Sequence, residues 1–398
     1  MKKTQFYDGF TTFNPNLFGT QDEEIHALRR RQLAHAFSFT SMKDMEMFVD
    51  VHLQKLMENL DHCCKTGEMF DLKQFIAFYV LDVLGELAFS RSFDSQIHMD
   101  PDRLPPINDH IYLACLMGMV PSMMPIFKAV APWVPLPWFR SLFRARRQLK
   151  ELTADCVARR MLKGTDRRND LLTNLINSVD PETGEKLTEL EINTEAFAMI
   201  VAGSHTTSGT LTLLFAHLLQ NPRTMALVVD ELDRELQDVQ VDVVPIEGLE
   251  ATLPYTMACI NENFRINPVF TMPLPREVMA PEGADIDGHI IPRHTTVFCE
   301  NHVVHHNASI WGHDHNIFKP ERFLGPQSEH YKRYLTPFSI GHRMCIGRNL
   351  AMMNILKVTT TLLKRYEFVL EHPKEKIVSV SVGISEKEGP LMCRVRKR

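Results

Sequence analysis

The segment Phe338-Ser-Ile-Gly341-His-Arg343-Met-Cys345-Ile-Gly347, near the C-terminal end of the chain, decides the prediction of both fold and chemistry. Its cysteine follows a glycine turn and precedes an amphipathic run over residues 346–366, which predicts a helix. A thiol at a helix N-terminus faces unpaired backbone N–H groups and the positive end of the helix dipole, and Arg343 stands two residues away. Both effects favour the thiolate form of Cys345.

The two glycines shape the surroundings of this thiolate. Gly341 allows the tight turn, and Gly347 leaves no side chain between the helix start and whatever lies against the sulfur. A thiolate held in this way is a good axial ligand for haem iron, whereas most lone cysteines are buried free thiols. The spacing Phe-x-x-Gly-x-Arg-x-Cys-x-Gly resembles the haem-binding loop of the cytochrome P450 superfamily. The resemblance implies haem b ligated by Cys345, with Phe338, Gly341, Arg343 and Gly347 around it.

A second motif, Ala202-Gly-Ser-His-Thr-Thr207, lies within a long apolar helix pattern. Gly203 and Thr206 share one helix face, and small residues on a buried helix usually serve helix packing. The segment also resembles the family's oxygen-activation motif, in which glycine makes room for dioxygen and threonine supports its protonation. An acid normally precedes that threonine. Here His205 does, and its imidazole can relay protons because its free pKa of about 6.5 is close to working pH.

Glu262 and Arg265, three residues apart on a predicted helix, could form an ordinary surface pair worth a few tenths of a kcal/mol. Their flanks, together with Lys319-Pro-Glu-Arg322-Phe323, instead resemble the family's Glu-x-x-Arg helix and its Pro-Glu-Arg-Phe segment. The resemblance implies a buried charged triad of Glu262, Arg265 and Arg322 behind the haem loop. Removing one member of such a triad would leave the others as buried charges and cost several kcal/mol.

The two haem propionates need cations, and the resemblance supplies four candidates. Arg343 lies in the loop, Arg276 matches the family's strand arginine, and His26 with Arg30 matches its third helix. Arg29 and Arg31, beside Arg30, are expected on a solvated helix face.

A histidine-rich stretch offers a competing chemistry. His302, His305 and His306 have His-x-x-His spacing, and His313 and His315 follow. The stretch lacks the cysteine partners or the Glu-flanked helix that make zinc motifs specific. We expect it to be the family's meander between sheet and haem loop, not a metal site.

Composition and periodicity predict a mainly α chain with a small β-sheet. The 398 residues, 44% hydrophobic and 23% charged, can bury a large core, and the net charge of −5 gives no reason to expect nucleic acid. Eight scattered cysteines without a C-x-x-C fit a reduced intracellular environment.

No linker divides residues 1–398, so one domain is expected. Helices are predicted over residues 24–37, 42–65, 72–89, 139–161, 171–176, 188–219 and 254–266, and strands over 273–278, 289–291, 296–299, 377–382 and 391–395.

The N-terminus carries no apolar run that could be a signal peptide or membrane anchor. By the resemblance, the chain starts just before the family's third major helix, so the anchor, the first helices and part of the sheet would be absent. The most apolar internal stretch, Ile111 to Trp138, is interrupted by five prolines and one lysine, so a continuous spanning helix is not expected. It is either a buried helix followed by a Pro-rich loop or the family's cavity roof, which dips into the membrane surface.

Together these observations predict a haem-thiolate monooxygenase, N-terminally truncated and similar to fungal microsomal members. It would insert one oxygen atom from O2 into a small, largely apolar organic substrate, in secondary metabolism. Because no G-x-G-x-x-G fingerprint is present, NADPH would act through a separate cytochrome P450 reductase. That reductase would dock on the thiolate side, which carries Arg29, Arg31, Arg348 and Lys357. The family's place is the cytosolic face of the endoplasmic reticulum membrane, whereas this chain as written would be cytoplasmic or peripheral.

Two alternatives stay open. In the first, the haem-thiolate protein catalyses a rearrangement or dehydration without external electrons, for which His205 in place of the acid is the support. In the second, the truncated product is inactive.

Overall fold

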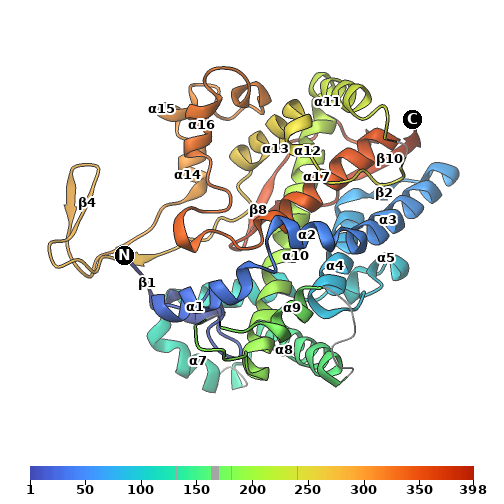
Figure 1. The fold of residues 1–398 in the computed structure, drawn as a ribbon. Helices are drawn as coiled ribbons and strands as arrows, with labels where there is room; N and C mark the ends of the chain where they lie inside the picture. Colours follow the sequence, from blue (N-terminus) through green and yellow to red (C-terminus); the bar gives the residue numbers. More distant parts are fainter. Residues whose placement is uncertain (131–132, 163–169, 181, 240) are drawn as a thin grey trace.

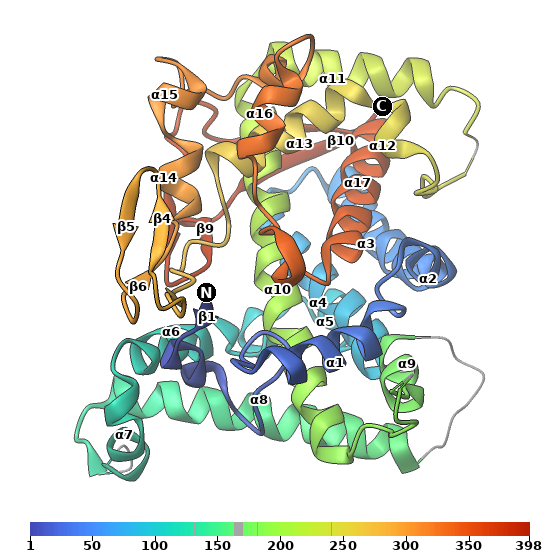
Figure 2. The ribbon, with the colours of Figure 1, turned by 60° about the vertical axis from the view of Figure 1, so that its left-hand side comes forward.

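The 32-residue helix α10 (Glu189–Gln220) runs through the middle of the molecule (Figures 1 and 2). It begins at a capping box, in which Thr188 Oγ1 accepts from the Glu191 N–H and the Glu191 carboxylate accepts from the Thr188 N–H at 2.8 Å. Apolar residues occur all around α10, so its sides are covered by other helices. The computed structural model describes residues 1–130, 133–162, 170–180, 182–239 and 241–398.

Helices dominate on both sides of α10. Those before it are α1 (Glu23–Ala34), α2 (Phe39–Asp44), α3 (Glu46–Thr66), α4 (Leu72–Phe89), α5 (Ser95–His98), α6 (Ile107–Met119), α7 (Met124–Val130), α8 (Pro137–Leu162) and α9 (Leu171–Asn177). Those after it are α11 (Pro222–Glu235), α12 (Leu249–Thr252), α13 (Pro254–Ile266), α14 (Asn301–His305), α15 (Ala308–Trp311), α16 (Ser328–Tyr334) and α17 (Arg348–Arg365). Short 3-10 turns include η1 (Gln5–Phe10), η3 (Pro121–Met123), η5 (Pro320–Phe323) and η6 (Gly341–Arg343).

The strands are short and form small antiparallel sheets. They are β1 (Lys2–Lys3), β2 (Phe70–Asp71), β3 (Arg276–Glu277), β4 (Ala284–Ile286), β5 (His289–Ile291), β6 (Thr296–Val297), β7 (Tyr366–Leu370), β8 (Ser379–Ser381), β9 (Ser385–Lys387) and β10 (Met392–Lys397). Within the described residues they pair in the orders β1-β3-β6, β2-β10-β7, β4-β5 and β8-β9. The β4–β5 hairpin projects away from the helices (Figure 1). The prediction of a mainly α chain with a small sheet is confirmed.

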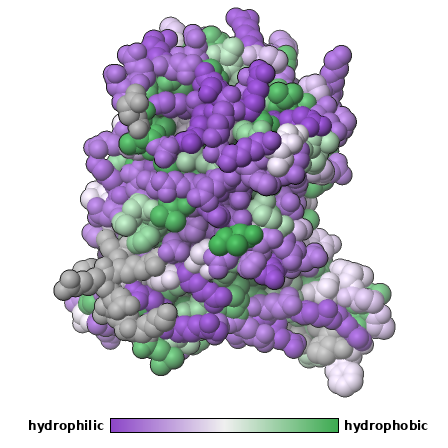
Figure 3. Space-filling view, turned by 90° about the vertical axis from the view of Figure 1, so that its right-hand side faces the viewer, coloured by the Kyte–Doolittle hydropathy of each residue, from purple (hydrophilic) through white to green (hydrophobic). Residues whose placement is uncertain are grey.

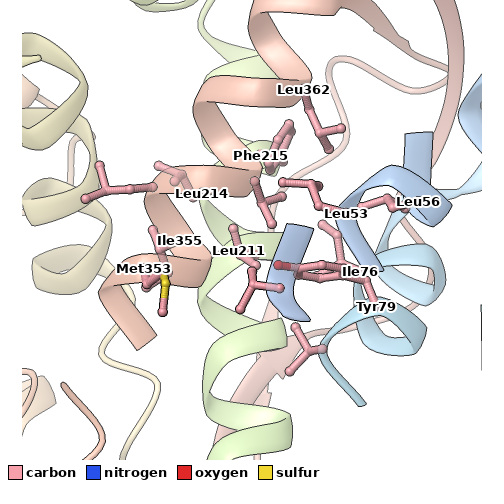
Figure 4. Close-up of a cluster of buried hydrophobic side chains, with 14 of the residues drawn as sticks. Leu53, Leu56, Ile76, Tyr79, Leu211, Leu214, Phe215, Met353, Ile355 and Leu362 are labelled. Carbon is pink, nitrogen blue, oxygen red and sulfur yellow. The ribbon is translucent and has the colours of Figure 1, made fainter. Parts of the chain in front are cut away.

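The main core lies where α3, α4, α10 and α17 meet (Figure 4). Each leucine buried there contributes about 1.5–3 kcal/mol relative to an exposed one. One polar link crosses this core, because Tyr79 Oη donates to Asn354 Oδ1 at 2.8 Å. The labelled side chains of the cluster are Leu53, Leu56, Ile76, Tyr79, Leu211, Leu214, Phe215, Met353, Ile355 and Leu362. This packing holds α10 and α17 at fixed positions relative to each other, and the site is built on both.

Several predicted boundaries are wrong by a few residues. The predicted helix 42–65 is two helices, α2 and α3, because the chain turns at Met45. The helix predicted to continue to Tyr366 ends at Arg365, and residues 366–370 form β7 against β10. Among the described residues no single helix is long and apolar enough to cross a bilayer. The bent pair Ile107–Met119 and Pro121–Phe127, at 105°, passes the same test only when taken together.

Candidate functional site

Cys345 lies in the short segment between η6 and α17. The chain is turned there by two residues with positive φ, Ser339 at 61° and Gly341 at 72°, a conformation that glycine adopts without strain. The Cys345 N–H donates to the Phe338 carbonyl at 2.8 Å, which closes the loop. A Cβ added at Gly347 would lie 3.9 Å from the Cys345 sulfur. Cys345 is exposed, so a ligand can reach this residue.

The ionisation of this thiol differs from the prediction. Burial raises the pKa of Cys345, and the Gly347 N–H and the charge of Arg30 oppose the rise without cancelling it. The helix α17 begins only at Arg348, and the Arg343 guanidinium is paired with the Glu23 carboxylate at 2.9 Å. The protein alone therefore does not favour the thiolate. A metal ion deprotonates a coordinating thiol outright, so iron would supply the missing stabilisation.

Two arginines connect α1 and the cysteine loop. Arg30 Nη1 donates to the Met344 carbonyl at 2.6 Å, directly beside Cys345. Arg343 Nη1 donates to the Thr20 carbonyl at 2.9 Å, in the segment that precedes α1. His26 is buried on the inner face of α1, with its ring 6.0 Å from that of His342. Burial, followed by the charges of Arg343 and Lys3, lowers the pKa of His26 to about 4, so its ring is neutral at physiological pH.

Sequence reasoning missed Lys3, which lies on β1 beside β3. Its side chain is buried, donates to the Phe18 carbonyl and sits 4.3 Å from the centre of the Tyr7 ring. Burial, then the charges of Arg343 and Arg276, lower the pKa of Lys3 to about 6. A lone lysine in a two-residue strand has no spacing signal, so the sequence offered no means of finding it.

One region thus gathers five basic side chains, those of Lys3, His26, Arg30, Arg276 and Arg343. The charge of the Glu23 carboxylate acts on two of them, Lys3 and His26. Arg276 donates to the Leu274 carbonyl at 3.0 Å and also contacts the Tyr7 hydroxyl. A buried excess of positive charge is unfavourable unless anions approach it. These basic side chains suit the two propionate carboxylates of haem, and the Cys345 thiol beside them suits its iron. The residues present therefore fit a haem group.

The α10 motif is only partly covered by protein. Ala202 is exposed and Gly203 and Thr206 are half-buried, although the helix runs through the middle of the protein. Thr206 Oγ1 donates to the Ala202 carbonyl at 2.6 Å, one turn earlier. A Cβ added at Gly203 would lie 2.8 Å from Leu84 Cδ2 on α4, so the glycine allows close helix packing. That Gly203 also makes room for dioxygen stays a prediction.

The structure brings together the three residues of the charged triad. Arg265 and Glu262 are fully buried and form two bonds of 2.7 Å, while Arg322 Nε lies 3.4 Å from Glu262 Oε1. Arg265 also donates to the carbonyls of His305 and His315 at 2.9 and 2.6 Å. The triad therefore ties α13 to the meander, which is an architectural role.

The histidine-rich stretch forms part of the same meander. His305 is fully buried, and its Nε2 accepts from the Thr336 N–H at 3.2 Å. The rings of His302 and His306 stack with centroids 4.1 Å apart. Over the described residues, no group of three or more His, Cys, Asp or Glu side chains is placed to hold a metal ion.

One predicted surface residue is not on the surface. Lys357, expected on the docking face, is buried in α17, contacts Glu46 and lies 2.7 Å from Asp50 Oδ1. The prediction was wrong because the helix turns this residue inward, where two carboxylates neutralise it. Arg29 is also partly withdrawn, since it pairs with Glu191. Arg31 and Arg348 are exposed.

A cysteine loop, a buried group of cations and an accessible threonine on a central helix are the parts of a haem-thiolate oxygenase. Comparison with known proteins agrees with this class. The model of the Cytochrome P450 family matches residues 3–393, and the chain belongs to that family. It is an oxidoreductase of the monooxygenase type, with haem ligated by a cysteine thiolate.

Three similar proteins from fungi illustrate the relationship. A benzoate 4-monooxygenase of Aspergillus niger is 28% identical over 423 residues, covering 100% of this chain and 80% of the relative. A cytochrome P450 monooxygenase of Aspergillus flavus is 27% identical over the same length and with the same coverage. Pisatin demethylase of Fusarium vanettenii is 26% identical over 390 residues, covering 94% of this chain and 72% of the relative. The family implies a small-molecule substrate, O2 and a redox partner.

Proposed function

We propose that this monooxygenase inserts one oxygen atom from O2 into a small, largely apolar organic substrate in fungal secondary metabolism. The names of two relatives give benzoate and pisatin as what they act on, and both are small organic molecules.

One observation carries this proposal. Cys345, just before α17, is exposed, and Ala202, Gly203 and Thr206 of the central helix α10 are not fully covered by protein. Ile346, next to the cysteine, packs on the same apolar cluster as Ile200 and Val201 of α10. The loop before α17 and the middle of α10 are seen together in Figure 2. A group ligated by Cys345 would thus be held close to the α10 motif.

The bound haem supplies the binding and activation of dioxygen, because a thiolate ligand pushes electron density towards it. The chain's own residues do the rest. Arg30, Arg276 and Arg343 would hold the propionates by charge. Burial lowers the pKa of Lys3 to about 6, so Lys3 would add its charge only where a nearby propionate keeps it protonated. The Thr206 hydroxyl donates to the Ala202 carbonyl in this structure. When its O–H turns away from that carbonyl, the hydroxyl can donate its own proton while its oxygen accepts one from the protein side, so the proton count balances.

The spectrum of the reduced protein under carbon monoxide tests the ligand. We expect the strongly red-shifted Soret band of a thiolate-ligated haem, and its loss in Cys345→Ser. Cys259→Ser and Cys393→Ser are matched controls because both thiols are buried elsewhere in the main core. An unchanged band in Cys345→Ser would show that another residue ligates the iron.

Electrons are proposed to come from an NADPH–cytochrome P450 reductase docked near Arg31 and Arg348. Arg348 and Lys43 line a surface hollow of about 230 Å³ between α2 and the start of α17. Cations at the rim of an interface mainly raise the association rate and are screened by salt. The double variant Arg31→Glu/Arg348→Glu should therefore be reduced more slowly and lose most of its salt dependence. Arg293→Glu, in the turn after β5, is the control. Equal rates for both would place docking elsewhere.

A further inference from the structure

The face of α10 that carries His205 is covered by strand β9. Gly209 lies one turn after His205 and so shares its face. A Cβ at Gly209 would stand 3.0 Å from the Ser385 carbonyl of β9, so the strand backbone runs directly against the helix. The Ser385 N–H donates to the Val269 carbonyl at 2.6 Å, which fixes the strand in this position. Glu386, the next residue, is therefore held beside the His205 face.

The carboxylate of Glu386 belongs to a small polar group. Lys73 Nζ, at the start of α4, lies 3.4 Å from Glu386 Oε2 and donates to the Lys387 carbonyl at 2.7 Å. Asn108 Nδ2 of α6 donates to Glu386 Oε1 at 3.5 Å. The Glu386 side chain is 32% exposed, so it reaches solvent.

His205 lies on the inner side of this group. Its Nδ1 is 3.0 Å from the Ser204 hydroxyl, and Nε2 has no hydrogen bond to the described residues. The ring is surrounded by protein, and burial lowers its pKa, with the charge of Lys73 acting in the same direction. The charge of Glu386 acts in the opposite direction and favours the imidazolium.

We propose that Glu386 of β9 replaces the acid that the α10 motif lacks, and that it acts by stabilising the protonated form of His205. The proposal rests on the monooxygenase function above and adds a positioning residue from a different element. A proton from solvent binds His205 next to the Glu386 carboxylate. The imidazolium then releases one proton towards the space beside Thr206 and returns to the neutral ring, so proton and charge balance.

A simpler alternative is that Lys73 and Glu386 form only a surface ion pair, worth about 0–1 kcal/mol. The two ideas differ in what Glu386→Gln does to His205. If Glu386 acts on the imidazole, the titration midpoint of His205 falls by about 0.5–1 pH unit. If the pair is only structural, the midpoint does not move.

The measurement is NMR of the full-length holoprotein, ferrous and carbon monoxide-bound, labelled in its histidine rings. The His205 signal is assigned by its loss in His205→Gln. The matched control is Glu388→Gln, an exposed side chain just after the end of β9. We expect a lower midpoint in Glu386→Gln, an unchanged one in Glu388→Gln and a higher one in Lys73→Met.

The coupling of NADPH consumption to product formation gives a second test of the role of Glu386. Glu386→Gln should lower the fraction of NADPH consumption that appears as product, most strongly at high pH, with little change in KM, and Glu386→Asp should restore it. An equal His205 midpoint in wild type and Glu386→Gln overturns the inference, as does a ring that does not titrate between about pH 5 and 9. Failure of the proposed function is distinguishable, since the red-shifted carbon monoxide band would then be missing in the wild type.

Discussion

At the scale of single residues, the Thr206 hydroxyl is a test of oxygen chemistry. It is accessible on α10 and donates to the Ala202 carbonyl at 2.6 Å. If it passes protons to dioxygen, Thr206→Ala should reduce the coupled fraction of NADPH consumption by about tenfold or more and raise peroxide release. The readout is product and peroxide per NADPH with the reductase present.

Thr210→Ala is the matched control for that experiment. Thr210 makes the same bond one turn later, to the Thr206 carbonyl at 2.8 Å, but its side chain is buried. Both variants therefore lose a hydrogen bond from a threonine hydroxyl to a helix carbonyl. Only Thr206→Ala also loses an accessible hydroxyl. Unchanged coupling in Thr206→Ala would exclude this role and favour rearrangement chemistry that needs no NADPH.

Single residues also mark the limit of reading this sequence. The triad of Glu262, Arg265 and Arg322 could be predicted because two motif segments carry it, the Glu-x-x-Arg helix and the Pro-Glu-Arg-Phe segment. Lys357 could not be placed correctly from the sequence. Helix periodicity does not show whether a carboxylate from another helix will pair with a buried lysine, and here Glu46 and Asp50 of α3 do so. The ionisation of Cys345 was also mispredicted, because burial outweighs nearby dipoles and charges, and burial is a property of the fold.

At the scale of elements, α4, α10 and α13 match their predicted bounds within one or two residues. Each has strong local signals: an Asp71 cap, the Thr188 capping box and a proline at the first position of α13. Strands of two or three residues, such as β1 and β9, carry no periodic pattern and owe their existence to partners far along the chain. Lys3 lies on β1 and Glu386 lies on β9. The two residues that the sequence did not single out are therefore on strands that the sequence did not predict.

The contact between α10 and the segment before α1 gives a pH prediction. The Glu195 carboxylate accepts from the Leu17 N–H at 3.0 and 3.2 Å. Burial raises the pKa of Glu195 from 4.5 to about 7, and the Leu17 N–H and Arg29 only partly oppose it. The folded state therefore holds this proton more tightly than the unfolded state. Its contribution to stability is fully present below pH 4.5 and is lost as the pH rises through about 7.

Glu195→Gln removes this titration. Relative to the wild type, the variant should gain up to about 3 kcal/mol in unfolding free energy at pH 8, and much less at pH 5. Urea denaturation at the two pH values measures the difference. Glu282→Gln, on an exposed side chain, should show no such pH dependence. A gain for Glu195→Gln that is equal at both pH values would contradict the assignment.

At the scale of the whole molecule, polar and apolar surfaces are separated. The face on the right-hand side of Figure 1 is largely hydrophilic, with scattered apolar side chains (Figure 3). Among the described residues from Met119 to Trp138, most exposed side chains are instead apolar, and they include Met119, Ile126, Trp133 and Trp138. The inner side of α6, with Ile111 and Met117, is buried. The stretch is thus a buried helix that leads into an exposed apolar segment.

We propose that this apolar segment rests on a membrane surface, as expected for attachment to the cytosolic face of the endoplasmic reticulum. The chain has three tryptophans, and two of them, Trp133 (82% exposed) and Trp138 (52%), lie in the segment. The third, Trp311, is fully buried and serves as an internal reference. On addition of phospholipid vesicles, the fluorescence of the exposed pair should shift to the blue and be quenched by brominated acyl chains.

Trp133→Ser/Trp138→Ser should weaken vesicle binding severalfold, because two aromatic rings no longer leave water for the lipid boundary. The remaining Trp311 signal should then be insensitive to brominated lipid. Val303→Ser removes a comparably exposed apolar side chain from α14 and should bind vesicles like the wild type. If the double tryptophan variant and the Val303 variant partition equally, the segment does not face the membrane. The apolar surface would then require another partner, since exposed tryptophans at this density are unfavourable in water.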